Sequence, residues 1–533
     1  MNLRKMAGIR SVFICSLFLL NPPLSASSKI LTLSFVGGSH YLLMSEMSRV
    51  LHESGHEVTM FVQSGNIMIS GVGEQDCKLA SSYKIMTWSS GEEFETAFKE
   101  LFAELEITFI EGRSDLSSFL KLMVHFASQC NILLNQSHIF DSLRAEKYDI
   151  VVVDSFNPCC FLFVEKLGLP FVSFFPSIFA DAPKMGIPSP LSYVPVYQSR
   201  LTDRMDFWER MKNAFMYVTS KIVDHQVHKI FDRVLEDQFE EGARPVFSEL
   251  YQKTELWIYN TDFSIEFARP LLPNTIYIGG ILARPAKPVS QELEEFIATS
   301  GDAGFIIVTL GSMVSSVRRS QLLEEMNAGF AVMPQKVIWR YQQSKWPTEL
   351  KLAPNAKIYD WLPQNDLLGH PKVRLMVTHG GMNSLMESIY HGVPVLGIPL
   401  FGDQFDNMVR AMAKKIGIAI SADQLTMKRL TTSMKKLIED PSYKLAAAAQ
   451  SKIHRSESLP PDQKLVRWIE HIIASKGGAH LRPYSSQQPW YQQYLLDVIA
   501  FLFTSVSVVI YICVKLLRTV LSKLLRQNKL KKP

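Results

Sequence analysis

The first half of the chain alternates short apolar runs with helical patterns. Residues 30–36 and 57–62 are β-branched apolar runs of strand length, and a segment with apolar positions at helical spacing lies between them. Two similar runs occupy residues 150–153 and 171–174, and residues 93–134 have a mostly helical pattern rich in Phe, Leu and Met. Strand-length runs separated by helices are typical of a parallel sheet. We therefore predict a doubly wound α/β domain in this half.

The same alternation starts again in the second half. Prolines and a Gly-Asp pair interrupt the pattern at residues 284–304, where we place the join between two domains. In doubly wound sheets, ligands bind at the carboxyl ends of the strands, so we expect an active site in the cleft between the domains. The strand runs of the second half are residues 305–309, 336–339, 374–378 and 394–398. The two predicted domains are residues 28–285 and 286–480.

Both ends of the chain carry targeting patterns. Residues 1–27 combine basic side chains, an apolar run and small residues, as a secretory signal peptide does. An N-terminal membrane anchor is the alternative, although the apolar run is shorter than the ~20 residues that span a bilayer. Residues 495–514 are apolar enough for a transmembrane helix, and residues 515–533 are rich in Lys and Arg without an acidic residue. The positive-inside rule predicts a single-pass type I protein with a luminal body and a cytosolic tail.

The last five residues have lysines at the third and fifth positions from the end, which fits retrieval to the endoplasmic reticulum. A solvated basic tail is the alternative. Much of the net charge of +5 lies in this tail, so composition does not indicate nucleic-acid binding. The body contains Cys77, Cys130, Cys159 and Cys160, which allow a disulfide without fixing its pairing and form no zinc or redox motif. Asn135 begins a glycosylation sequon.

The most informative stretch is residues 360–404, which begins with an aromatic side chain at a strand end. Trp361 can stack on a flat base if its indole is exposed, and Gln364 can bond the nucleoside. A core aromatic is the alternative for Trp361. Glu387 follows Asn383 by four residues and shares its helical face, so its carboxylate could accept both hydroxyls of a ribose.

The residues between these side chains form a glycine-containing turn from a strand into a helix. The free N–H groups and the dipole of such a helix N-terminus fit a diphosphate without a metal. His379, Asn383 and Ser384 add side-chain donors, while the adjoining glycines, including Gly381, permit close approach. An ordinary helix cap is the alternative.

Two further segments of the second half belong to the same predicted site. Thr309 and Ser312 flank a second strand-to-loop turn, which should face the same place. Asp403 and Gln404 pair a carboxylate with an amide, which suits the hydroxyls of a sugar. The alternative for Asp403 is a helix cap.

In the first half, His40 lies on the first strand-to-helix turn, and Asp154 ends a strand that could be the neighbour of the first. A carboxylate that orients an imidazole is the arrangement of a general base, which removes a proton from a hydroxyl. The pKa of histidine suits that task near neutral pH. A structural histidine is the alternative.

Residues 361–404 resemble the signature of UDP-glycosyltransferases, in the form found in vertebrate UDP-glucuronosyltransferases. The resemblance covers nearly the whole chain and looks closest to the 3A subfamily, through the Gly-Gly-Ser-His-Tyr-Leu-Leu-Met run of residues 37–44 and through residues 267–275. It implies a GT-B fold and an inverting, metal-independent hexosyltransferase that needs no cofactor. The implied donor is UDP-glucuronic acid, or UDP-N-acetylglucosamine, UDP-glucose or UDP-xylose as in the 3A subfamily, and the implied acceptors are small lipophilic molecules, as in detoxification.

The resemblance also implies roles for individual residues. His40 would be the catalytic base and Asp154 its partner. Family members usually have Pro after the Asp-Gln pair, where this chain has Phe405, so we expect the loop at the sugar to differ. The implied UDP-sugar contacts are Thr309, Ser312, Arg340, Trp361, Gln364, His379, Gly381, Asn383, Ser384, Glu387, Asp403 and Gln404.

Other functions were weighed against this one. A catalytically weak membrane protein could bind UDP-sugars or lipophiles and regulate related transferases through homo- or hetero-oligomers. A nicotinamide-dependent oxidoreductase is disfavoured because no Gly-x-Gly-x-x-Gly motif follows a predicted strand. The Phe- and Met-rich residues 94–134 and 171–185 either line an apolar acceptor pocket or form ordinary core.

Overall fold

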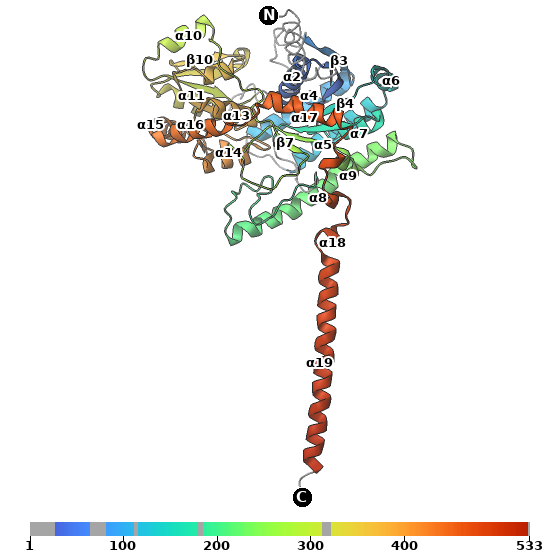
Figure 1. Cartoon of the computed structure of the whole chain (residues 1–533). Helices are drawn as coiled ribbons and strands as arrows, with labels where there is room; N and C mark the ends of the chain where they lie inside the picture. Colours follow the sequence, from blue (N-terminus) through green and yellow to red (C-terminus); the bar gives the residue numbers. More distant parts are fainter. Residues whose placement is uncertain (1–26, 64–81, 111–115, 178–184, 312–320, 531–533) are drawn as a thin grey trace, which may run out of the picture. The chain divides into compact units, whose positions relative to one another are not determined.

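The structure is a computed structural model that describes residues 27–63, 82–110, 116–177, 185–311 and 321–530 (Figure 1). The predicted signal peptide, apart from residue 27, and Ser312 lie outside the described residues. The chain divides into a compact unit that ends at His480 and a second unit that begins at Leu481.

The first half contains a parallel sheet, as its apolar runs predict. Its strand order in the described residues is β3-β2-β1-β4-β5-β6-β7, and all paired strands are parallel. The strands are nearly continuous apolar runs because helices cover such a sheet on both faces. Their bounds are β1 (Lys29–Ser34), β2 (Glu57–Gln63), β3 (Lys84–Trp88), β4 (Ile150–Asp154), β5 (Phe171–Phe175), β6 (Trp257–Tyr259) and β7 (Thr275–Tyr277).

The second half contains another parallel sheet with the described order β10-β9-β8-β11-β12-β13. Both sheets reverse their strand order at one place, between β1 and β4 in the first sheet and between β8 and β11 in the second. Ligands of doubly wound folds bind at such reversals. The strand bounds are β8 (Phe305–Thr309), β9 (Lys336–Arg340), β10 (Ala356–Tyr359), β11 (Val373–Thr378), β12 (Val395–Gly397) and β13 (Gly417–Ala419).

These sheets confirm the predicted fold class, two doubly wound α/β halves. The helices associated with the first half are α2 (Ser39–Glu53), α4 (Glu92–Ile110), α5 (Leu116–Leu134), α6 (Ser137–Glu146), α7 (Cys159–Leu167), α8 (Phe207–Gln238) and α9 (Phe247–Leu250). Those that follow in the chain are α10 (Gln291–Ala298), α11 (Gln321–Ala331), α12 (Gln364–Leu368), α13 (Met382–His391), α14 (Gln404–Ala413), α15 (Met427–Glu439), α16 (Pro441–Arg455) and α17 (Pro461–Ala474). The predicted boundary between residues 285 and 286 falls between β7 and α10 and stays a prediction.

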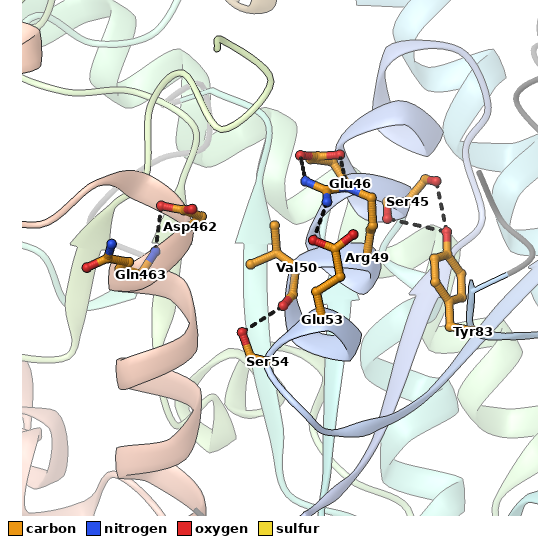
Figure 2. Close-up of polar contacts among 9 residues, drawn as sticks. All are labelled: Ser45, Glu46, Arg49, Val50, Glu53, Ser54, Tyr83, Asp462 and Gln463. Carbon is orange, nitrogen blue, oxygen red and sulfur yellow. Dashed lines mark hydrogen bonds and ion pairs between the residues drawn. The ribbon is translucent and has the colours of Figure 1, made fainter. Parts of the chain in front are cut away.

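Helix α2 carries its apolar side chains inward and a charged group outward. Leu43, Met44 and Met47 are buried, whereas Figure 2 shows Arg49 lying between Glu46 and Glu53, to both of which it is ion-paired. Salt bridges of this kind at i, i+3 and i, i+4 add a few tenths of a kcal/mol each to a helix, about 0.2–0.5. Burial of the inner face therefore contributes more than these pairs to holding α2 against the sheet.

Helix α2 also contacts α17, the last helix of the large unit (Figure 2). The imidazole of His56 lies 3.6 Å from the carboxylate of Glu470 in α17, and the backbone N–H of Gly478 donates to Glu255 at 2.7 Å. The chain thus returns from the second half to the first before it reaches the final helix.

The described residues include one disulfide, between Cys130 of α5 and Cys159 of α7. This bond settles the pairing that the sequence leaves open. It ties together two helices that pack in the same buried cluster beside the first sheet. Closing a loop of 29 residues stabilises a fold by about 3–4 kcal/mol in the chain-entropy description.

The smaller unit contains α18 (Trp490–Gln493) and α19 (Leu496–Leu530). Residues Leu496–Arg526 have a mean hydropathy of 2.3 and meet the length and composition needed to cross a membrane. At ~1.5 Å per residue, the 35 residues of α19 reach about 52 Å, which exceeds the ~30 Å hydrocarbon core. The helix therefore extends beyond the predicted span, residues 495–514, into the basic tail.

Candidate functional site

A cavity of about 600 Å³ is lined by residues from the carboxyl ends of both sheets. It contains most of the residues that the sequence predicts for the site. His40, Thr309, Arg340, Trp361, Gln364, His379, Gly381, Asn383, Ser384, Glu387, Asp403 and Gln404 all line it. Asp154 lies directly behind His40, and Ser312 is outside the described residues.

His40 and Asp154 form a buried hydrogen-bonded pair at the strand-order reversal of the first sheet. Leu33 of β1 is the parallel partner of Val153 of β4, so the turn after β1 and the end of β4 are adjacent. The imidazole Nδ1 and the Asp154 Oδ2 are 2.8 Å apart, and the other carboxylate oxygen accepts the backbone N–H of Phe156 at 3.2 Å. A carboxylate at Nδ1 favours a proton there, which leaves Nε2 as the acceptor.

The N-terminus of α13 lies at the corresponding reversal of the second sheet. Gly381 precedes the helix, and no side chain caps it. An α-helix leaves its first N–H groups without intrahelical partners, so this uncapped end presents donors to an anion. Asn383 and Ser384 are in the first turn, where Ser384 bonds Gln364 at 3.2 Å and Asn383 bonds Asn260 at 2.7 Å.

His379 lies between two glycines at this end of the helix. A Cβ atom on either Gly311 or Gly381 would stand 2.5 Å from the His379 Nε2, which is closer than real contacts allow. The sequence predicts close ligand approach at Gly381, and the structure shows that the imidazole needs the same space. Burial, with a contribution from the nearby Arg340 charge, lowers the pKa of His379 to about 4, so it is neutral at pH 7.

Trp361 is exposed over 40 % of its surface, which rules out a sealed core position. The guanidinium of Arg340 lies 4.8 Å from the centre of the indole and donates to the carbonyl of Gly311. Burial lowers the pKa of Arg340 to about 10, but the group stays charged at neutral pH. A cation over one face of the indole polarises it and leaves exposed ring surface for a flat ligand.

Glu387 is buried in the same wall of the cavity. Its carboxylate accepts a hydrogen bond from Gln364, and burial raises its pKa to about 7, although Gln364 and the charge of Arg284 act in the opposite direction. A carboxyl group that titrates near pH 7 can change its charge when a ligand donates hydrogen bonds to it.

Asp403 and Gln404 begin α14 at the far end of this wall. Asp403 makes no side-chain cap to the helix, so the capping alternative is not what the structure shows, and its Oδ2 accepts from Asn407 at 2.7 Å. The Gln404 Oε1 accepts the backbone N–H groups of Leu400 and Phe401 at 2.8 and 3.0 Å. These bonds hold the side chain in place and leave its NH₂ group as the donor.

Asp406, which sequence reasoning missed, joins the two halves beside this loop. Its carboxylate accepts the backbone N–H groups of Gln198 and Arg200, at 2.5 and 2.9 Å. Both of those residues have positive φ angles, 63° and 55°, which cost energy for side chains other than glycine. The Arg200 guanidinium also lies 4.0 Å from the ring of Phe405, so the residue that replaces the family's proline takes part in this contact.

The first half supplies an apolar region to the same cavity. The residues concerned come mainly from α4, α5 and the loop before α8, as expected from the Phe- and Met-rich segments. They include Phe102, Leu105, Phe119, Leu122, Met123, Phe126, Phe156, Phe175, Met185, Leu191 and Val194. Both interpretations of these segments hold in part, because Met123 and Phe126 also belong to the buried cluster of the first half.

Comparison with known proteins agrees with this geometry. Residues 28–531 match the family described as UDP-glucoronosyl and UDP-glucosyl transferase. The chain is 52 % identical to UDP-glucuronosyltransferase 3A1 of Xenopus laevis, covering 99 % of this chain and all of that protein, and 47 % identical to the Homo sapiens 3A1 protein with the same coverage. It is 33 % identical to the Mus musculus 2-hydroxyacylsphingosine 1-beta-galactosyltransferase, over 89 % of this chain and 84 % of that one.

Solved structures show the same architecture. The calicheamicin glycosyltransferase CalG4 superposes with a TM-score of 0.56 at 15 % identity, over 84 % of this chain and 98 % of that one. The glycotransferase of kitacinnamycin gives 0.58 at 17 % identity, over 84 % and 99 %. The chain therefore belongs to the UDP-glycosyltransferase family and has the GT-B fold. Within the family it is of the 3A type, and it is a glycosyltransferase.

The pKa of Glu387 predicts a pH-dependent affinity for UDP. Ribose hydroxyls donate to the ionised carboxylate, so UDP selects that form, and the affinity should rise with pH through about 7. From pH 6 to pH 8 the ionised fraction of such a group grows about tenfold. We expect calorimetry on the full chain to show the affinity ratio of wild type to Glu387→Gln rising by that factor.

The ratio removes the titration of UDP itself, because both proteins bind the same ligand. The same shift has the opposite sign for stability. The folded pKa lies above the ordinary value near 4.5, so the contribution of Glu387 to stability falls as pH rises from 4.5 to 7. A ratio that stays constant between pH 6 and pH 8 would show that UDP does not use this carboxylate.

Proposed function

We propose that the protein transfers a sugar from a UDP-sugar to a hydroxyl group of a small lipophilic acceptor, with inversion at the anomeric carbon. The observation that carries the proposal is one shared cavity. His40, held by Asp154, lines its first-half wall, and the uncapped end of α13 and Trp361 line its second-half wall. This arrangement supports a base and a leaving-group site on opposite sides of one reacting carbon.

The chemical step follows from the pair of His40 and Asp154. The acceptor oxygen attacks the anomeric carbon, the bond from that carbon to the diphosphate oxygen breaks, and UDP leaves with the bonding electrons. The acceptor proton moves to the Nε2 of His40, and the Asp154 carboxylate stabilises the imidazolium that forms. One displacement from the face opposite the leaving group inverts the configuration.

Negative charge develops on the diphosphate as the bond breaks, and the second half supplies groups that stabilise it. The donors are the N–H groups at the start of α13, with Ser384, Asn383 and the neutral His379 beside them. Fixed donors aimed at developing charge are the largest single contribution in many enzymes. The proposal therefore needs no metal ion.

The sugar end of the cavity favours an uncharged hexose. Burial lowers the pKa of Arg410, but the carboxylates of Glu266, Asp406 and Asp403 raise it further, and Glu266 is ion-paired to it at 2.9 Å. One guanidinium thus faces three acidic side chains. A glucuronate carboxylate would add a fourth negative charge there, whereas N-acetylglucosamine or glucose would bring hydroxyls that can bond Asp403 and Gln404.

We also propose that the protein is a type I protein of the endoplasmic reticulum with its catalytic body in the lumen. The disulfide between Cys130 and Cys159 fits an oxidising compartment. Asn135 is exposed at the end of α5, as a glycosylation acceptor must be. The candidate membrane helix and the basic tail support the orientation.

Replacing the base tests the proposed function. We expect His40→Ala to lower kcat by ~10²–10⁴-fold, because general-base catalysis contributes that much, with little change in UDP affinity by calorimetry. Asp154→Asn should lower kcat less while also leaving UDP binding intact. His138→Ala is the matched control, because this histidine is exposed on α6 and lies outside the described cavity lining. An equal loss of UDP binding and turnover in His40→Ala would make the residue structural.

A panel of donors tests the sugar assignment. With one phenol as acceptor, we expect kcat/KM to be higher for UDP-N-acetylglucosamine or UDP-glucose than for UDP-glucuronic acid, because of the acidic side chains at Asp403 and Asp406. Asp403→Asn should narrow the difference by relieving the repulsion. A preference of the wild type for UDP-glucuronic acid would contradict the assignment.

A further inference from the structure

Helix α8 has its orientation fixed by a buried asparagine. The Asn213 side chain donates to the carbonyl groups of Leu191 and Val194 and accepts the backbone N–H of Val196 at 2.8 Å. The helix begins with a capping box of Asp206 and Glu209. These contacts, a fully buried amide among them, determine which face of the N-terminal half of α8 points away from the protein.

That outward face is apolar. Trp208, Met211, Phe215, Val218 and Ile222 are spaced by three and four residues, so they form one stripe along the helix. Between 55 and 74 % of the surface of each side chain is exposed, an unusual proportion for five large apolar residues in a row. We call this set the α8 stripe.

The stripe ends where the helix turns polar. One and two turns beyond Ile222, the same face carries the exposed residues Gln226 and Lys229, and the inward residues Val227 and Phe231 are buried. The stripe is therefore a local patch and not a general property of α8. Exposure of this much apolar surface costs about 25 cal/mol per Å² unless something covers it.

The same helical turns face the cavity on their inner side. Met216, Tyr217, Ser220 and Val223 line the cavity, and they alternate with the stripe residues along the sequence. One wall of the cavity is thus formed by a helix whose other side is apolar and exposed.

We propose that the α8 stripe inserts into the surface of the membrane that holds α19, so that α8 is a second, monotopic contact of the body with the bilayer. The occupant is lipid because the chain carries its own candidate membrane helix, which keeps the body at a bilayer surface at high effective concentration. Basic side chains also flank the stripe, as expected for contact with lipid headgroups. They are Arg204, Arg210, Lys212 and Lys221.

This contact has a consequence for acceptors, which rests on the proposed function. Lipophilic acceptors concentrate in the bilayer, and a cavity wall in contact with the membrane shortens their path to His40. The stripe should therefore act on the apparent KM of acceptors that partition into lipid, and leave kcat unchanged.

Photocrosslinking tests the occupant without any need for catalysis. A benzophenone amino acid replaces Phe215 in the full chain, reconstituted in nanodiscs of phosphatidylcholine and phosphatidylserine, and mass spectrometry identifies the adducts. Lys229, on the same face of α8 beyond the stripe, is the matched control position. We expect several-fold more phospholipid adduct at position 215 than at 229. An adduct to a second copy of the chain, to another protein, or equal yields at both positions would overturn the proposal.

The kinetic consequence is tested with Phe215→Ser combined with Ile222→Ser. Neither residue lines the described cavity, so thermal stability and kcat should be unchanged. In nanodiscs, we expect a several-fold higher apparent KM for a lipid-partitioning phenol and an unchanged KM for a water-soluble one. Lipid adducts with equal KM values would remove the acceptor path but retain the membrane contact. Loss of turnover in all variants, wild type included, would instead contradict the proposed function.

Discussion

The hydrogen bond between His40 and Asp154 constrains the rest of the site. It is formed only because β1 and β4 are neighbours at the strand-order reversal, which places the turn after β1 against the end of β4. The bond orients the imidazole and assigns the proton to Nδ1, so Nε2 is available to an acceptor hydroxyl. Everything in the second half, from the end of α13 to Asp403, has a catalytic meaning only relative to that nitrogen.

The second half repeats the same topology with a different chemistry. Its strand-order reversal holds an uncapped helix end and a buried, neutral imidazole instead of a base. His40 and His379 occupy comparable turns, yet burial beside the Arg340 charge lowers the pKa of His379, which suits a hydrogen-bonding role better than proton transfer. Two copies of one fold thus supply a base and a diphosphate site, and the membrane contact proposed for α8 adds a path for the acceptor.

Much of this could be read from the sequence because its signals are local. Long β-branched runs such as residues 305–309 predict buried strands, and glycine before a helix predicts the turn at residues 379–384. Strands of three to five residues, such as β6, β7 and β13, were missed since a short run does not show a period. Helix α8 was also missed, because its apolar residues lie on both the inner and the outer face.

Contacts between distant segments could not be read from the sequence. The backbone N–H groups of Gln198 and Arg200 meet Asp406 across some 200 residues, and no local pattern marks a loop that will bind a carboxylate. Asn260 could have been suspected, because it follows the end of β6, but that strand was itself missed. The pairing of Cys130 with Cys159 likewise depends on how α5 and α7 pack.

The stereochemistry of the product tests the central claim most directly. A base at His40 facing a diphosphate held by α13 allows a single displacement, so a UDP-α-sugar must give the β-glycoside. Proton NMR of the product reports this through the large coupling constant of an axial anomeric proton. The account predicts the β-anomer alone; formation of the α-anomer would mean that the nucleophile and the leaving group share one face, and that His40 and α13 do not act on opposite sides of the sugar.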